Sequence, residues 1–450
     1  MISKENKEFL KLILSIVIPV SFQGLIATTL NMADTVMVSS LGESSIAAVG
    51  LVNQYMYFFF VTIFGICSGS AIFMSQYYGK RDNKNINIQY AIMMVLVFLI
   101  GLVFTICSII FKNQLLALLS HEQEVRDQAK IYLDIIIWTF VITGLSFGVT
   151  TAFRSCGNAK IPVQISVVSF FTNIFFNYVL IFGKLGFPAL GVAGAAYGTL
   201  IARIIELLVS LFVLSRPFVV FRFDIKYLFE LNKEYILRYF KIAAPVIAAE
   251  TLWSLSQLFF SVIYARNGKQ AVAAVQITNT IQNVFFILSN SFCAAASVII
   301  GQLIGSKDYD KTNNYASKFL KLTIFIGLAS SAILMLFPNA MLLLYRGLEP
   351  GLKDVSKNLL IIRGIFILFR FINAMFVIGI FRGGGDSRIP LLYEIFTIWV
   401  LALPASIIAT FILNLNIEKV FIIVSLEEVI KMALLIPRYL SGKWLVNVTE

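Results

Sequence analysis

Two acidic residues lie inside long apolar segments, with no basic residue within four positions on either side. Asp34 is the one ionisable residue between Leu12 and Val38, and Glu250 follows Pro245 by five positions in a second such segment. A carboxylate in hydrocarbon costs at least about 2.5 kcal/mol, so an intramembrane acid marks a candidate site for a cation or a proton. The alternative is a structural acid that joins helices through hydrogen bonds.

Amide side chains recur at helical spacing in the other apolar segments. Asn173 and Asn177 are four residues apart, and Asn31 precedes Asp34 by about one turn, so each pair shares a helix face. Such stripes either join helices or line a wet cavity, and two acids without a basic neighbour favour the cavity. We assign cation coupling to Asp34, Asn31, Asn173, Asn177 and Glu250, and the substrate cavity to Asn53, Tyr55, Gln276, Asn279 and Asn283.

Other intramembrane charges have partners on their own helix. Opposite charges three or four residues apart neutralise each other on one helix face, as Arg203 and Glu206 do, or Lys431 with Glu427 or Glu428. This arrangement favours structural ion pairs. It leaves one of the two adjacent glutamates, Glu427 or Glu428, without a basic partner on its own helix. Arg363 and Arg370 are seven residues apart and so share a helix face, where we expect an acidic residue of a neighbouring helix to pair with them.

The sequence shows no metal-ligand cluster and no nucleophile beside a base. His121 is the single histidine, and the four cysteines show neither a pairing pattern nor a metal-ligand spacing. The sequence GGGD at Gly383–Asp386 lacks the preceding strand and the terminal GK[ST] of a phosphate-binding loop, so it predicts a tight turn. We therefore expect neither an enzyme nor a bound cofactor.

Composition places these side chains in a membrane. Hydrophobic residues make up 59% of the 450 and charged residues only 13%, against about 25% in soluble domains. The net charge of +12 resides in short segments between apolar spans, which indicates lipid contact and topology rather than nucleic-acid binding. Twelve continuous apolar spans predict helices, at about 9–40, 46–76, 88–111, 131–153, 162–183, 190–215, 237–265, 271–302, 315–337, 358–381, 390–413 and 420–437.

An internal repeat organises these spans. An alignment of the second half on the first that places Pro245 on Pro19 also places Asn279 on Asn53. A slightly longer offset places Arg382 on Arg154. Copies six spans apart share one orientation, which predicts two parallel-repeat six-helix bundles. The expected domains are an N-terminal bundle (1–215), an amphipathic linker on the inner membrane surface (216–236) and a C-terminal bundle (237–450). Lys and Arg are about twice as frequent on the side that holds both termini, which predicts cytoplasmic termini.

The pattern resembles the multidrug and toxic compound extrusion (MATE) family of transporters. The matching stretches are Asn31–Val38, Leu41–Val49, Asn173–Gly183 and Gly191–Thr199. The resemblance implies export of amphipathic, often cationic drugs in exchange for Na⁺ or H⁺. It also implies a polar site at Asp34, Asn173 and Asn177, which would be the ligands if Na⁺ is the coupling ion, and a helix bend at Pro19. The family often has Asp at the position of Asn177, so one charge is missing here.

We expect a monomer in the cytoplasmic (inner) membrane that contacts organic substrates, the coupling cation and lipids. Binding of the coupling ion would neutralise an acid and so release a cationic substrate. The alternative is a flippase for lipid-linked saccharides on a related scaffold. A flippase would need cationic side chains for the diphosphate, for which Arg363 and Arg370 are the candidates.

Overall fold

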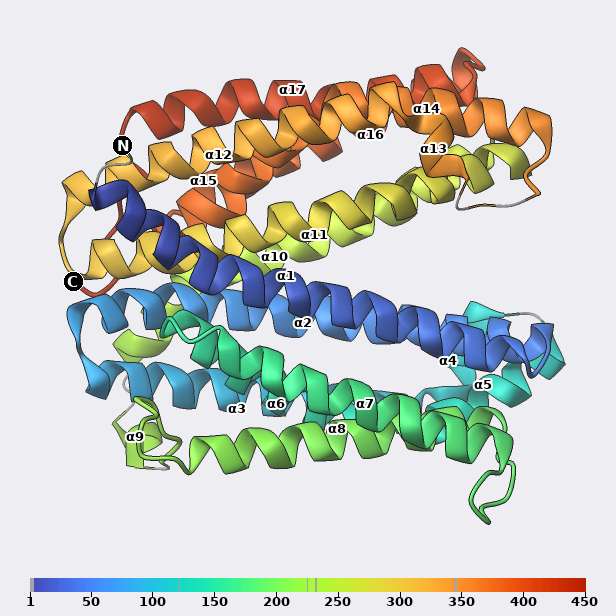
Figure 1. Cartoon of the computed structure of the whole chain (residues 1–450), viewed down its shortest axis with the longest axis horizontal. Helices are drawn as coiled ribbons and strands as arrows, with labels where there is room; N and C mark the ends of the chain where they lie inside the picture. Colours follow the sequence, from blue (N-terminus) through green and yellow to red (C-terminus); the bar gives the residue numbers. More distant parts are fainter. Residues whose placement is uncertain (1–3, 121, 225, 231–232, 344, 346) are drawn as a thin grey trace. The chain divides into compact units, whose positions relative to one another are not determined.

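The computed structural model describes residues 4–120, 122–224, 226–230, 233–343, 345 and 347–450, and these residues are predominantly helical (Figure 1). The helices of the first half are α1 (Lys4–Ser39), α2 (Glu43–Lys80), α3 (Asn83–Ile110), α4 (Lys112–Leu119), α5 (Gln123–Ile136), α6 (Thr139–Ser155), α7 (Lys160–Phe182), α8 (Val192–Leu214) and α9 (Lys226–Phe229). Those of the second half are α10 (Lys233–Ala265), α11 (Lys269–Gly305), α12 (Tyr309–Leu336), α13 (Pro338–Leu342), α14 (Pro350–Ala374), α15 (Arg388–Glu394), α16 (Leu403–Ile407) and α17 (Ile417–Leu440), with π-helical stretches η1 (Met375–Phe381), η2 (Ile395–Ala402) and η3 (Ile408–Ile412).

All twelve predicted spans fall on helices, so the all-helical fold class is confirmed. In the described residues, ten helices are long and apolar enough to cross a membrane, and an eleventh span is the pair α5 and α6, which is bent by 51°. The twelfth segment is α17, whose 24 residues include Glu427, Glu428 and Lys431. Because of these charges, α17 is less apolar than the other spans although it is long enough to be one.

The repeat is visible in the backbone. Left-handed residues occur at Arg81 and Lys307, both with φ of 61°, and these two positions coincide when Pro245 is aligned on Pro19. In each case the next residue is an aspartate, Asp82 or Asp308, whose side chain caps the following helix. These turn positions therefore repeat with the alignment seen in the sequence, which shows that the two halves share one local architecture.

The chain forms two compact units, residues 18–239 and residues 1–17 with 240–450. These limits differ from the predicted domains because α1 and α10 each begin on one unit and continue in the other. The start of α1 packs on α12, where Phe9 contacts the rings of Tyr315 and Phe319 at 4.6 and 5.3 Å. The start of α10 packs on α2, where the Tyr239 hydroxyl donates to the carbonyl of Ile66.

The segment predicted as a linker packs against the first unit. Phe221 is buried, with its ring 4.9 Å from those of both Tyr90 and Phe153. The backbone amide of Arg222 donates to the side chain of Asn87. The segment is therefore part of the fold of this unit and not a free connection.

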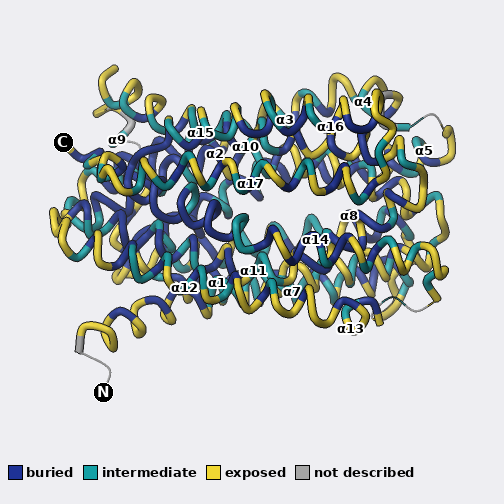
Figure 2. Tube along the Cα trace, turned by 90° about the horizontal axis from the view of Figure 1, so that it is seen from above, coloured by how far each residue is buried: buried dark blue, intermediate teal, exposed yellow. Residues whose placement is uncertain are grey.

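The C-terminal tail packs on the turn between η1 and α15. The amide of Val446 donates to the carbonyl of Gly384, and a Cβ atom at Gly384 would lie 2.5 Å from the carbonyl oxygen of Trp444. Trp444 is almost fully buried and stacks on Tyr439. The predicted tight turn at Gly383–Asp386 is thus present. Because its glycines have no side chains, the C-terminal tail can pack directly against the backbone of the turn. Within each unit, buried and exposed positions alternate along the helices (Figure 2).

Candidate functional site

Asp34 lies at the end of a chain of hydrogen bonds that joins three helices of the first unit. The side-chain amide of Asn177 donates to Oδ1 of Asp34 over 2.7 Å and to Oδ1 of Asn173 over 2.9 Å. The amide of Asn173 in turn donates to the hydroxyl of Thr199 over 3.3 Å. The structure therefore brings together Asp34, Asn173 and Asn177, as the spacing of the asparagines predicts, and adds Thr199 from α8.

Close packing of α7 on α8 holds the asparagines in place. A Cβ atom at Gly198 would lie 2.0 Å from Oδ1 of Asn177, and one at Gly194 would lie 2.5 Å from the carbonyl of Leu180. Small residues four apart let two membrane helices approach closely. Oδ1 of Asn177 is buried and has no hydrogen-bond donor in the described residues. The site therefore contains a buried acceptor that receives no hydrogen bond from the described residues.

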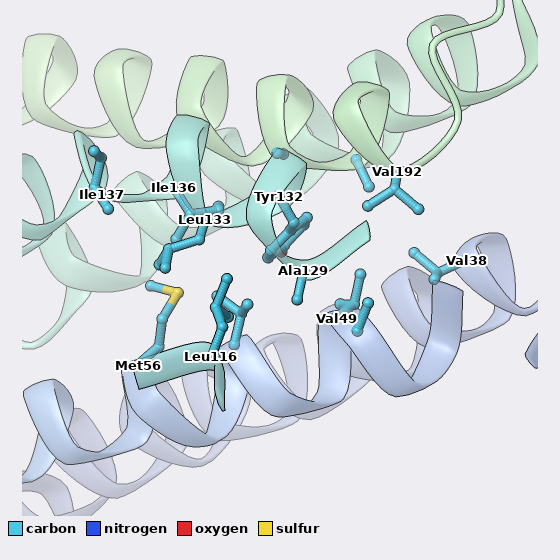
Figure 3. Packing of buried hydrophobic residues seen from close by; sticks show 14 of the residues in the cluster. Val38, Val49, Met56, Leu116, Ala129, Tyr132, Leu133, Ile136, Ile137 and Val192 are labelled. Atoms are coloured by element: carbon cyan, nitrogen blue, oxygen red, sulfur yellow. The ribbon is translucent and has the colours of Figure 1, made fainter. Parts of the chain in front are cut away.

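The same unit contains an apolar cluster with members on α1, α5, α7 and α8 (Figure 3). It includes Val38, one turn after Asp34, and Tyr132 on α5, which are both buried. Tyr132 thus places a buried phenol within this apolar packing. Sequence reasoning missed Tyr132 and Thr199, although Thr199 ends one of the quoted stretches.

A cation lies beside this site. Arg203, one turn after Thr199, pairs with Glu206 at 2.6 Å, as predicted from their spacing, and it also acts electrostatically on Asp34. Oε2 of Glu206 accepts a further hydrogen bond from Ser169. The three charges leave a net charge of −1, so the site retains the charge needed to take up one monovalent cation.

Two further predicted positions behave differently. The Asn31 side chain is exposed and makes no hydrogen bond within the described part of the chain, so it is not joined to Asp34. Helix α1 continues through Pro19 without interruption. The bend at Pro19 therefore remains a prediction.

The predicted cavity residues are divided between the two units and differ in burial and partners. Asn53, Gln276 and Asn283 are exposed, each on the helix α2 or α11. Tyr55 is half-buried and accepts a hydrogen bond from Ser108 at 3.0 Å. Asn279 accepts one from Arg363 at 3.4 Å. A role for these five residues in substrate binding stays a prediction.

Glu250 has a partner, contrary to the interpretation of it as a lone acid. Nη2 of Arg382 lies 2.7 Å from Oε1 of Glu250, and both side chains are largely buried. The arginine comes from the end of η1, far along the chain, so spacing within one helix could not reveal the pair. The repeat offered a signal, because Arg382 corresponds to Arg154.

The second unit contains further buried ion pairs. Lys431 pairs with Glu427 at 3.2 Å, as its spacing predicts. The remaining acid, Glu428, lies 3.9 Å from Arg370 and accepts a hydrogen bond from Asn373 at 2.8 Å. Arg370 thus lies near an acid of a neighbouring helix, as expected. The contact of Asn373 with Glu428 was not predicted from the sequence.

The donor set at Asp34 suits a proton or a small hard cation. It offers carboxylate, amide and hydroxyl oxygen atoms, which hard cations prefer. Among the residues that the structure describes, no group of three or more His, Cys, Asp or Glu could hold a metal ion. An ion at Asp34 would therefore be held by one charge and neutral oxygens, which favours reversible binding over permanent coordination.

Comparison with known proteins identifies what the chain is similar to. The family model MatE matches residues 19–179 and 245–424, two segments that start at the repeat-equivalent prolines Pro19 and Pro245. An uncharacterized transporter, YisQ, of Bacillus subtilis is 25% identical over 413 residues, which cover 92% of this chain and 90% of the relative. A probable multidrug resistance protein, NorM, of Thermotoga maritima is 22% identical over 443 residues, or 98% and 94% of the two chains.

Solved structures share the fold. A crystal structure of MATE in the bent conformation superposes with a TM-score of 0.87 at 22% identity, covering 97% of this chain and 95% of the other. The outward-facing conformation of a multidrug resistance MATE family transporter gives 0.86 at 21% identity, with 96% and 95% covered. The likeness in fold therefore extends over both halves of the chain.

Proposed function

Because the chain belongs to the MatE family of membrane transporters, we propose that it exports amphipathic organic compounds, including cationic ones, in exchange for H⁺ or Na⁺. The relatives named as probable multidrug resistance proteins support this substrate class. The observation that carries the coupling proposal is the hydrogen-bonded chain Asp34–Asn177–Asn173. It places one carboxylate next to neutral donors and acceptors in an apolar unit.

The proposed exchange depends on competition for the charge of Asp34. When the carboxylate is ionised, it accepts a hydrogen bond from Asn177 and attracts a cation. When it binds a proton or Na⁺, that attraction is lost and the hydrogen bonds rearrange. An ion can drive transport only if its affinity differs between two conformations of the protein, and a rearranged Asp34–Asn177 contact, with the bend at Pro19, would supply the difference.

The test is dye efflux from vesicles that contain the purified protein, under separately imposed Na⁺ and pH gradients. Asp34→Asn mimics the neutral state, so it should fold but lose the response of efflux to the gradient. Glu43→Gln, an exposed acid at the start of α2, is the matched control and should respond like wild type. Gradient-driven efflux at the wild-type rate by Asp34→Asn would make Asp34 a structural residue.

The flippase alternative depends on unpaired cations in the second unit. Of the arginines on or next to its spans, Arg382 pairs with Glu250 and Arg370 lies near Glu428. Arg363 has no such acid within the described residues. A flippase would therefore have a single uncompensated guanidinium for a diphosphate in this part of the chain, which is a weak basis for that function.

A further inference from the structure

A buried arginine without an acid partner in the described residues lies among four helices of the second unit. Arg363 on α14 is 8% exposed, and its guanidinium lies 4.5 Å from the centre of the Phe421 ring on α17. Its Nη2 donates to Oδ1 of Asn279 on α11 over a long 3.4 Å, and its Nε is buried with no acceptor among the same residues. Tyr264 on α10 is also buried here, with its ring 6.1 Å from that of Phe421.

The other buried cations of this unit are compensated. Arg382, Arg370 and Lys431 each lie within 4.0 Å of a glutamate oxygen, the longest separation being the 3.9 Å between Arg370 and Glu428. A buried charge without a counter-ion is destabilising, and replacement by an apolar residue is often neutral or stabilising. The position of Arg363 therefore requires a reason other than stability.

The repeat shows that the scaffold does not need a cation at this point. With Pro245 aligned on Pro19, Arg363 falls on Ile137 and Tyr264 falls on Val38. With Arg382 aligned on Arg154, Arg363 falls on Ile135, which is apolar as well. Val38 and Ile137 both belong to the apolar cluster of the first unit (Figure 3). The first bundle thus has apolar residues at the positions of both Arg363 and Tyr264, so the guanidinium at this point is particular to the second bundle.

The unused donors define the chemistry of the missing partner. The Nε–H and Nη2–H of an arginine lie on one edge of the guanidinium and match two oxygen atoms of a carboxylate or phosphate. The Nε–H of Arg363 has no acceptor in the described residues and the Nη2–H makes only a long contact, so this edge of the guanidinium lacks a strong hydrogen-bond partner there. The surrounding Tyr264 and Phe421 rings suit an apolar body attached to that anionic group.

We propose that Arg363, with Asn279 and Tyr264, binds the oxyanion of an amphipathic compound, which makes carboxylate-bearing and zwitterionic molecules substrates of this chain. This inference rests on the proposed transport function and specifies its substrate class. The Arg363 guanidinium would exchange its weak contact with Asn279 for two charge-assisted hydrogen bonds. A cationic group elsewhere on the same molecule would remain free to interact with an acid.

The test compares two fluorescent probes that differ only in one carboxylate, tetramethylrhodamine and its methyl ester. Binding to the purified protein in detergent is measured by fluorescence polarisation. Wild type should bind the free carboxylate about tenfold or more tightly than the ester, the size expected of a desolvated charge-assisted pair. Arg363→Gln should bind the two probes within about twofold of each other.

Controls separate the role of the guanidinium from that of folding. Arg388→Gln removes an exposed arginine of the same unit and should keep the full preference. If Arg363→Gln fails to fold, Arg363→Lys keeps the charge without the planar fork and should reduce the preference to a few-fold. An equal affinity of wild type for both probes, or an unchanged preference in Arg363→Gln, would overturn the proposal.

Two further measurements identify the source of the oxyanion and distinguish the Arg363 proposal from the proposal of ion coupling at Asp34. If phosphatidylglycerol abolishes the preference and phosphatidylcholine does not, the site binds a lipid headgroup; if neither does, it binds the transported compound. Asp34→Asn should retain the preference for the carboxylate. Loss of gradient-driven efflux in wild type with the preference intact would reject the coupling proposal alone.

Discussion

Nη2 of Arg382 donates to Oε1 of Glu250 over 2.7 Å, and Nη2 of Arg154 donates to Oε1 of Gln23 over 3.1 Å. The two arginines are repeat equivalents, and their acceptors lie at neighbouring positions of the repeat, because Glu250 corresponds to Gly24. Each half thus joins the end of its fourth span to its first span by an arginine. A neutral amide suffices in one half, so the charge of Glu250 is not required by this link.

Removal of the two charges of the Arg382–Glu250 pair should have unequal effects. Glu250→Gln recreates the Arg–Gln contact of the first half, so we expect near-normal abundance and thermal stability but reduced export of cationic compounds. Arg382→Gln leaves a buried carboxylate without a cation and should destabilise the protein by about 3–5 kcal/mol. Thermal unfolding in detergent measures both variants, and wild-type stability of Arg382→Gln would contradict the importance of the pair.

Gly198→Ala should uncouple transport by displacing Asn177. Its Cβ atom would lie 2.0 Å from Oδ1 of Asn177 and 2.9 Å from the backbone nitrogen of that residue, so α7 must shift. We expect a loss of about 1–3 kcal/mol in stability and a weaker response of efflux to the gradient. Gly50→Ala, where a Cβ meets nothing within 4 Å, is the control. Normal coupling in Gly198→Ala would show that the Asn177 contact is dispensable.

Trp444→Ala should destabilise the second unit although it lies outside every span. The side chain is 1% exposed, stacks on Tyr439 and donates from Nε1 to the carbonyl of that residue. Loss of a buried Trp costs about 3–5 kcal/mol, so a lower unfolding temperature is expected. Val446→Ala, at an exposed residue of the same tail, should have little effect. Equal unfolding temperatures for the two variants would show that the tail does not stabilise the unit.

Cysteine labelling tests the predicted topology. In a background without the four native cysteines, Lys226→Cys and Lys307→Cys should resist an impermeant thiol reagent added outside intact cells. Lys184→Cys, in the loop between α7 and α8, should react. All three positions are exposed, so access within the protein does not limit the reaction. Labelling of Lys226→Cys and Lys307→Cys from outside would invert the assignment of cytoplasmic termini.

Local patterns predicted the fold well because membrane helices satisfy their own backbone. Continuous apolar runs are sufficient to locate such helices, and polar stripes at spacing four located Asn173 and Asn177. The same reasoning found the pairs Arg203–Glu206 and Glu427–Lys431, whose partners share a helix. These successes concern interactions within one helix or one face.

Contacts between distant segments were beyond the reach of spacing. Glu250 looked unpaired because Arg382 lies 132 residues away, and Asn373 meets Glu428 across 55 residues. The rotation of α1 about its axis also determines the exposure of Asn31. Its side chain is exposed, although Asp34 is half-buried one turn later. Spacing fixes the relation between two positions on a helix, but packing decides which of them faces a neighbour.

The exchange of helix ends between the two units imposes an order on biosynthesis. Glu5 and Glu8 bind Lys318 and Lys311, so the first turns of α1 complete their contacts only after α12, in the second half of the chain, has been made. The first unit, in turn, lacks Tyr235 and Tyr239 until the chain has entered its second half. Each unit therefore lacks part of its packing when only one half of the chain has been made. A ribosome that stalls between the halves would therefore leave two incomplete surfaces exposed, and quality control could recognise the interrupted protein by them.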